Sequence, residues 1–229
     1  MKKKVIVDYR TDPEVIKELN RLGFDAVKTM PVKALYYEVN GHSDMQFHFT
    51  GSKAICAPEV YSYYKKLLPG IDIISGSKKI GPKYPYDIAY NTCVIGDHVI
   101  CRCEYTADEI LSEYADKQIV DTKQGYAKCS ICVVNDNSAI TSDNGLYKLM
   151  KKKGLNVLKI SPCGIKLYGM TGFIGGASGL LDKDLLAFNG DLTTHRDHSN
   201  ITAFCRDAGV NTVSLSRNEL ADIGSIIRI

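Results

Sequence analysis

The sequence predicts an α/β fold, a five-fold pseudosymmetric propeller built from β-β-α-β units. Two observations carry this prediction. Two strands, a helix and a third strand recur along the chain, and the turn between the first two strands falls at a constant offset in four units. These turns, all of residue types that favour turns, are Gly51-Ser52, Gly96-Asp97, Asp136-Asn137 and Asp182-Lys183. Successive units account for all 229 residues, so we expect one domain over residues 1–229.

A helix is expected in every unit because apolar residues recur at helical spacing between residues that begin and end helices. In the first unit, Asp12 and Pro13 suit the start of a helix, and Gly23 suits the position after its end. The expected helices span residues 12–22, 58–68, 106–115, 143–153 and 197–208. A short apolar segment follows each helix and predicts a third strand, at residues 24–30, 71–75, 118–122, 156–160 and 211–215.

Second strands are predicted directly after the four turns, at residues 54–57, 99–102, 139–142 and 185–188. The fifth unit has no hairpin until the two ends of the chain are joined. Residues 222–229 are predicted as a strand with no helix after it, and residues 4–8 as a strand with no partner before it. Pairing of these two terminal strands would complete the fifth hairpin and close the ring.

Composition argues against several classes of partner. The net charge is +3, and no run of basic residues exceeds three, so nucleic-acid binding is not expected. The longest apolar runs are far shorter than the roughly 20 residues that span a bilayer, so no membrane partner is expected. The eight cysteines, such as Cys56 and Cys101, lie in apolar stretches typical of reduced thiols, which predicts a cytoplasmic location.

Cys129 and Cys132 have the Cys-x-x-Cys spacing of a redox or zinc site. Their stretch is predicted as a strand, however, where alternation turns the two thiols to opposite faces. The sequence therefore favours two structural thiols over a metal or redox site, and we expect no metal and no cofactor.

His42, Asp44 and Gln46 form a cluster of polar residues at the start of a predicted hairpin. Alternation along a strand puts all three side chains on one face. Burial of such a cluster is costly unless its members are paired or used, so it is either a satisfied polar pair or part of a site. The offset that aligns the hairpins makes four positions equivalent, with Ser225 near the same level: Asp44, Ala89, Cys129 and Gly175.

A ring of five β-β-α-β units resembles the penteins, the superfamily of guanidino-group-modifying enzymes that includes arginine deiminase, dimethylarginine dihydrolase and amidinotransferases. The resemblance covers essentially the whole chain, and residues 124–134 and 172–179 resemble more narrowly an uncharacterised bacterial branch of that fold. It implies a pocket on the axis. There a Cys thiolate would attack a guanidinium carbon, a His would move protons, and acidic side chains would bind the cation.

The family's motifs are only partly present. The His42-x-Asp44-x-x-Phe stretch resembles the family's His-x-Asp-x-x-Phe element, which implies proton transfer by His42 and cation binding by Asp44. The family's Cys near the C-terminus is matched by Ser225, a weaker nucleophile. Cys129 is the alternative nucleophile, with a thiolate that the preceding Lys128 would stabilise, unless it is a small apolar side chain that packs a strand.

Two functions fit these residues. In the first, the protein binds a small polar ligand, guanidino or amino-acid-like, in the axial pocket, contacted by Gln46, Asn91, Lys128 and Ser178. Any reaction would be that of a hydrolase or transferase acting on a guanidino or amidino group. In the second, the chain is a non-catalytic module of the same fold that binds a macromolecular partner. Ser225 stands where the family has its Cys, and residues 173–178, in the unit before it, contain no His. The absence of both residues from these places favours the second function, and the polar cluster at His42 favours the first. A homodimer is compatible with both.

Overall fold

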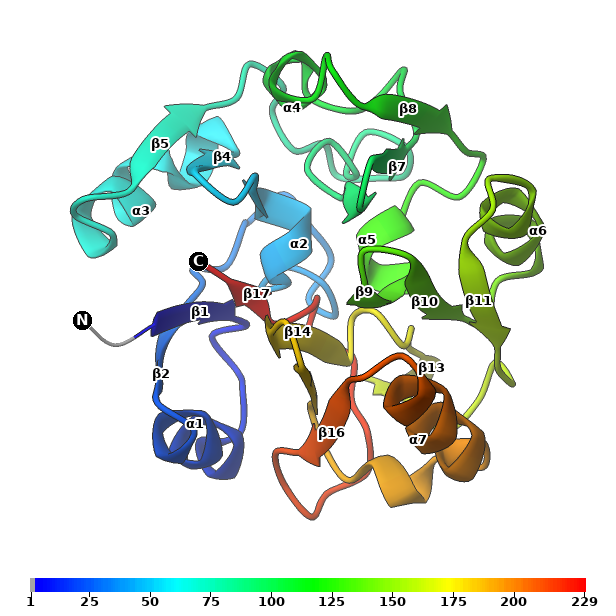
Figure 1. Ribbon diagram of the computed structural model, residues 1–229. Helices are drawn as coiled ribbons and strands as arrows, with labels where there is room; N and C mark the ends of the chain where they lie inside the picture. Colours follow the sequence, from blue (N-terminus) through cyan, green and yellow to red (C-terminus); the bar gives the residue numbers. More distant parts are fainter. Residues whose placement is uncertain (1–2) are drawn as a thin grey trace.

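Small, separate sheets make up most of the strand structure in the computed structural model, which describes residues 3–229. Five sheets have three strands each, and Figure 1 shows them arranged around a common centre with the longer helices toward the outside. In each of these sheets the middle strand runs antiparallel to one neighbour and parallel to the other. The sixth sheet is the hairpin of β12 (Lys166–Leu167) and β13 (Met170–Thr171).

The strands lie close to their predicted positions. Sheet by sheet they are β17 (Ile227–Arg228), β1 (Lys3–Val7) and β2 (Phe24–Lys28); β3 (Phe47–Phe49), β4 (Lys53–Cys56) and β5 (Asp72–Ser75); β6 (Cys93–Ile95), β7 (His98–Cys101) and β8 (Gln118–Asp121); β9 (Cys132–Asn135), β10 (Ser138–Thr141) and β11 (Asn156–Lys159); and β14 (Ser178–Asp182), β15 (Leu185–Phe188) and β16 (Asn211–Ser214). The predicted second and third strands all form, with ends shifted by at most two residues.

The predicted helices also form, again with slightly shorter bounds. They are α1 (Pro13–Arg21), the 3-10 turn η1 (Pro58–Val60) continuing into α3 (Tyr61–Leu67), α4 (Asp108–Glu113), α6 (Asn144–Lys152), and η2 (Leu192–Thr194) followed by α7 (His198–Asp207). Helix α1 begins where the Asp12 side chain accepts a hydrogen bond from the Glu14 amide. It buries Val15 and Leu19 in a cluster with the β1 and β2 side chains Val7 and Phe24, which fixes the helix against its sheet.

The two ends of the chain meet in one sheet, where Val5 of β1 lies opposite Arg228 of β17. The predicted strand over residues 222–229 is mostly wrong, because only Ile227–Arg228 is paired as a strand. Gly224 and Ser225 each have a φ of 71°, which takes the chain out of the extended conformation. Among residues 3–229 the six sheets stay separate, and no closed sheet forms.

The predicted strands through His42–Phe47 and through Cys129–Cys132 are wrong at their starts. One-turn helices, α2 (Ser43–Gln46) and α5 (Ala127–Ser130), precede β3 and β9, and both lie near the centre of the molecule in Figure 1. Residues two apart on a helix point about 200° apart, so Asp44 and Gln46 do not share the face that strand alternation would give them. Cys129 and Cys132 do not share a strand either, because Cys129 lies on α5 and Cys132 is the first residue of β9.

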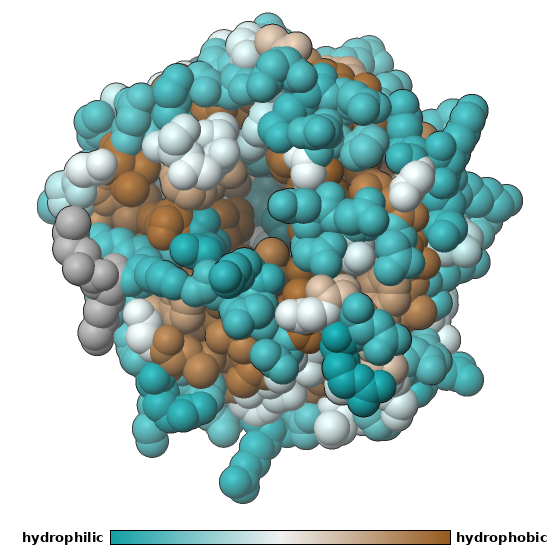
Figure 2. All heavy atoms as spheres, in the orientation of Figure 1, coloured by the Kyte–Doolittle hydropathy of each residue, from teal (hydrophilic) through white to brown (hydrophobic). Residues whose placement is uncertain are grey.

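Most of the face seen in Figure 1 is hydrophilic, and a hollow lies near its centre (Figure 2). Across residues 3–229, no helix combines the length and the apolar character needed to cross a membrane. The predicted domain over 1–229 includes residues 1–2, which lie outside the described residues.

Gly224 is a close-packed point between the C-terminal segment and α2. A Cβ at this position would lie 2.5 Å from the Cα of His42, and the φ of 71° disfavours any L side chain. Gly23 is a matched control, because its φ of 90° is also positive but a Cβ there would meet nothing within 4 Å.

We therefore expect Gly23→Ala to lower the free energy of unfolding by about 1–2 kcal/mol through backbone strain alone. Gly224→Ala should lower it by about 1–3 kcal/mol more, because it adds steric overlap with His42. Urea denaturation followed by circular dichroism measures both. Equal losses in the two variants would contradict the packing described for Gly224.

Candidate ligand-binding site

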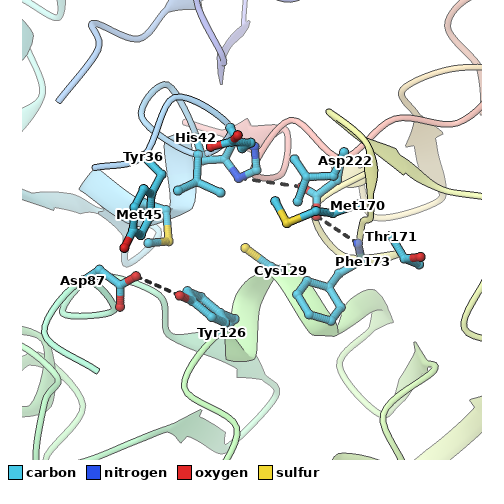
Figure 3. A pocket seen from close by; sticks show the side chains of 13 residues that line it. Tyr36, His42, Met45, Asp87, Tyr126, Cys129, Met170, Thr171, Phe173 and Asp222 are labelled. Atoms are coloured by element: carbon cyan, nitrogen blue, oxygen red, sulfur yellow. Dashed lines mark hydrogen bonds and ion pairs between the residues drawn. The ribbon is translucent and has the colours of Figure 1, made fainter. Parts of the chain in front are cut away.

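A cavity of about 480 Å³ opens near α2, α5 and the β12–β13 hairpin. Residues 36–45 form one wall, and the hairpin residues Leu167, Met170 and Thr171 form another. Figure 3 shows His42 and Asp222 at one side of this cavity and Asp87 with Tyr126 at another, with Cys129 between the two groups.

The charge that lines the cavity is negative. Glu38, Asp87 and Asp222 contribute carboxylates, and none of the described residues that line it is Lys or Arg. His42 is the only His among the described residues that line the cavity. Aromatic side chains complete the walls, among them Tyr126 and Phe173, whose ring centroids are 6.5 Å apart.

Asp222 is buried and held by the backbone. Its carboxylate accepts hydrogen bonds from the amides of Phe173, at 2.9 Å, and Gly224, at 3.0 Å. A Cβ on Gly176 would collide with this carboxylate, so the glycine makes room for it. Burial raises the pKa of Asp222 above its ordinary value, and His42, whose Nδ1 lies 3.8 Å from Asp222 Oδ1, opposes that shift.

Asp87 retains an unused acceptor inside the cavity wall. Its Oδ2 accepts a 2.7 Å hydrogen bond from the Tyr126 hydroxyl, whereas Oδ1 is buried with no partner. Burial raises the pKa of Asp87. A buried carboxylate oxygen without a donor is unfavourable, so this atom is suited to accept a hydrogen bond from a ligand.

Cys129 contacts a carboxylate directly. Its Sγ lies 3.1 Å from both oxygens of Asp44 and donates to them, and the amide Nδ2 of Asn91 donates to the sulfur at 3.2 Å. The Ser225 hydroxyl donates to Asp44 Oδ2 at 2.6 Å. Burial, followed by the negative charges of Asp44 and Asp222, raises the pKa of Cys129 well above its ordinary value. These effects oppose the expected stabilisation of a Cys129 thiolate by Lys128.

His42 is held in place through its neighbours in the chain. The Ser43 hydroxyl donates to the carbonyl oxygens of Gly224, at 2.6 Å, and Ser225, at 2.8 Å, while the Asp44 amide donates to Gly224 O at 3.0 Å. The His42 ring itself is buried, and neither ring nitrogen has a hydrogen-bond partner.

Six of the eight predicted site residues do not line the cavity: Asp44, Gln46, Asn91, Lys128, Ser178 and Ser225. Gln46 is used internally, because its Nε2 donates to Met30 O and its Oε1 accepts from the Tyr64 hydroxyl. Asn91 acts on Cys129 rather than on the cavity, because its Oδ1 also accepts from the amides of Lys128 and Cys129. His42 and Cys129 do line the cavity, and Asp44 lies directly behind the thiol.

Glu38, Asp87 and Asp222 were not predicted as site residues. Asp222 could have been suspected from the sequence, because Gly224 follows it two residues later. In the structure Gly172 and Gly176 also pack against Asp222. Glu38 and Asp87 lie in segments without regular structure, where no periodicity indicates the direction of a side chain.

Because the pKa of Cys129 is raised, we expect its thiol to react slowly with alkylating reagents. At pH 8 the exposed Cys163 should react with iodoacetamide well before Cys129, because little Cys129 is ionised. Asp44→Asn removes a negative charge and lowers the Cys129 pKa, so labelling of Cys129 should speed up severalfold. Cys132 is the internal control, because burial raises its pKa to about 11 without a contribution from Asp44. Peptide mass spectrometry gives the rates, and equal acceleration at Cys129 and Cys132 would contradict this account.

Comparisons with known proteins place the fold. Agmatine deiminase from C. jejuni has a TM-score of 0.61 at 9% identity, covering 99% of this chain and 92% of the deiminase. Dimethylarginine dimethylaminohydrolase from Pseudomonas aeruginosa, complexed with citrulline, has a TM-score of 0.56 at 9% identity over 100% of both chains. The inosamine-phosphate amidinotransferase of Streptomyces griseus has a TM-score of 0.58 at 10% identity, covering 99% and 93%. No curated protein sequence matches the chain.

These likenesses show the fold of the pentein superfamily. A family model matches residues 6–227, nearly the whole chain. The chain therefore belongs to the Family of unknown function (DUF6873) and has the pentein fold.

Proposed function

We infer that this protein is a divergent pentein that binds a small organic cation, with a guanidinium or amidinium group, in the cavity beside Asp222. The observation that carries this proposal is the charge of the cavity, which three carboxylates line without a Lys or Arg among the described lining residues. The proposal takes the chain as one domain and its five three-stranded sheets as the blades of a propeller, closed where β1 meets β17.

Hydrogen bonding and ring stacking both favour a planar cation. Asp87 Oδ1 and the carboxylate of Asp222 are acceptors for a guanidinium, whose N–H groups match carboxylates in pairs. Tyr126 and Phe173 offer aromatic faces to the same cation. A neutral or anionic ligand would leave the carboxylates without a counter-charge.

The same charge pattern narrows the class of ligand. A free amino acid carries an α-carboxylate, which the carboxylates of the cavity would repel. No Lys or Arg among the described lining residues could pair with that α-carboxylate. An amine without a carboxylate, such as agmatine, avoids that repulsion. We therefore propose a carboxylate-free guanidino compound as the ligand, in place of the amino-acid-like ligand that the sequence also allowed.

A reaction on such a ligand would use Cys129 as the nucleophile. A bound guanidinium adds positive charge beside the thiol and lowers its pKa, and the thiol proton passes to Asp44 at 3.1 Å. The thiolate forms a bond to the guanidinium carbon, and the C–N bond breaks as His42 supplies a proton to the departing amine. Water then displaces the sulfur for a hydrolase, or a second amine does so for an amidinotransferase. Ser225 lies outside this path, because its hydroxyl is bonded to Asp44 and Gly175.

Binding without chemistry is the second candidate. Burial and two neighbouring carboxylates keep Cys129 protonated, which suits a site that binds and does not react. Tyr36 and Met170 line the cavity and are more than half exposed, so a cationic side chain of a macromolecular partner would meet an apolar rim. Absence of product with agmatine bound would favour this second function.

Calorimetric titration tests the ligand. Agmatine should bind at least tenfold more tightly than arginine. Asp87→Asn should weaken agmatine binding by roughly tenfold or more, because a hydrogen bond to a charged group contributes about 1.5–3 kcal/mol. Because burial raises the pKa of Asp87, affinity should fall as the pH decreases through that raised pKa, above the range of an ordinary aspartate.

Asp97→Asn is the matched control, because Asp97 is an exposed carboxylate on the β6–β7 turn and does not line the cavity. The Asp97→Asn variant should bind agmatine with the affinity of the unmodified protein. Equal affinity for arginine and agmatine, or no effect of Asp87→Asn, would overturn the proposed ligand class. Release of ammonia or an amine, abolished by Cys129→Ser, separates catalysis from binding alone.

A further inference from the structure

We propose that His42, Asp44 and Cys129 form a binding site for one divalent transition-metal ion, of the Zn²⁺ class, at the inner end of the cavity. Each residue offers one ligand atom, and these atoms lie within 4.8 Å of one another. The metal ligands are groups that the proposed reaction also uses, but they differ from Asp87 and Asp222, which would bind the organic cation. The metal site requires no organic ligand, so it goes beyond the proposed function.

The three atoms are close to a zinc geometry. Zinc binds sulfur at about 2.3 Å and nitrogen or oxygen at about 2.0–2.2 Å, so ligand atoms of a tetrahedral site are roughly 3–4 Å apart. The Cys129 sulfur is already 3.1 Å from either oxygen of Asp44. The His42 nitrogen completes the set after a small side-chain rotation, because the greatest separation is below 4.8 Å.

The imidazole of His42 is the second, independent observation that points to a metal ion. The His42 side chain is 2% exposed and lines the cavity, yet both of its nitrogens lack a hydrogen-bond partner. Buried polar groups are rarely left in that state. A metal ion on one nitrogen, with the other turned toward Asp222, would satisfy both.

Each candidate ligand also has an outer partner of the kind that orients metal ligands. Nδ1 of His42 lies 3.8 Å from Asp222 Oδ1, so a small turn of the ring would let Asp222 accept a hydrogen bond from it behind the metal. Ser225 donates to Asp44 at 2.6 Å, and Asn91 donates to the Cys129 sulfur at 3.2 Å.

Charge and ligand type identify the ion. A thiolate, a carboxylate and a neutral imidazole together carry two negative charges, which a divalent ion neutralises in a buried site. Sulfur and nitrogen ligands select Zn²⁺ or Co²⁺ over Mg²⁺ and Ca²⁺, which prefer oxygen. His42 and Cys129 face the cavity, so a fourth position would be open to water or to a ligand, as in catalytic zinc sites.

Titration of Co²⁺ into the full chain, reduced and pretreated with a chelator, tests the site with no organic ligand present. We expect one Co²⁺ per chain, an absorption band from thiolate-to-cobalt charge transfer, and loss of that band when Zn²⁺ is added. Cys129→Ser should abolish the band. His42→Asn and Asp44→Asn should keep a band but weaken Co²⁺ binding at least tenfold. Cys132→Ser, which removes a buried thiol outside the cavity, should behave like the unmodified protein.

Circular dichroism and the melting temperature establish whether each variant is folded. If Cys129→Ser does not fold, the weaker Co²⁺ binding expected of His42→Asn tests the site in its place. The proposal is overturned if Co²⁺ gives no thiolate band, if the band persists in Cys129→Ser, or if neither His42→Asn nor Asp44→Asn weakens binding. Agmatine binding is measured separately in chelator. Its failure would leave the metal result unchanged, so the two proposals fail independently.

Discussion

The candidate site depends on the contact between the first turn of α2 and the segment around Gly224. Two backbone carbonyls of that segment accept from the Ser43 hydroxyl, and Gly224 O also accepts from the Asp44 amide. These partners are about 181 residues apart in the chain. Because glycine at position 224 leaves no side chain, His42 can sit directly against this segment. The contact sets His42 beside Asp222 and Asp44 behind Cys129, and so brings together groups from three separate parts of the chain.

The result is a buried cluster with more acidic groups than cations. Asp44 and Asp222 approach Cys129 and His42, and no Lys or Arg is among the described residues of the cavity wall. Burial and these carboxylates favour the protonated form of the Cys129 thiol. Both proposals follow from this imbalance, because a guanidinium and a metal ion each supply the missing positive charge. The guanidinium would bind at Asp87 and Asp222, whereas the metal ion would bind at His42, Asp44 and Cys129, the groups that the proposed reaction also uses. Binding of each ligand can therefore be measured separately.

Much of the fold was predictable because it repeats. The hairpin turns, the helix end signals and the third strands recur in register, and each agrees with the others. The one-turn helices α2 and α5 were not predictable, since four residues are too few to display a helical period. Alignment of the repeats made five positions equivalent or nearly so: Asp44, Ala89, Cys129, Gly175 and Ser225. In the structure Asp44, Cys129, Gly175 and Ser225 lie in contact, whereas Ala89 belongs to an apolar core cluster.

The chemistry of the site was harder to predict than its position. Lys128 was expected to act on the Cys129 thiol because it precedes Cys129 in the chain. The charges that act on the thiol instead come from Asp44 and Asp222. Neither long-range contact leaves a local pattern. The predicted ligand contacts of Gln46 and Ser178 also came from position in the chain, and in the structure their polar atoms make hydrogen bonds within the protein. A cytoplasmic location and a homodimer stay predictions from composition and fold.

The most direct test of the central claim, that the cavity is built for a cation, is a crystal structure of the protein grown with millimolar guanidinium. The account predicts a guanidinium ion inside the cavity, with nitrogen atoms within hydrogen-bonding distance of Asp87 and Asp222. A cavity that excludes guanidinium, or that holds an anion from the same solution, would contradict it.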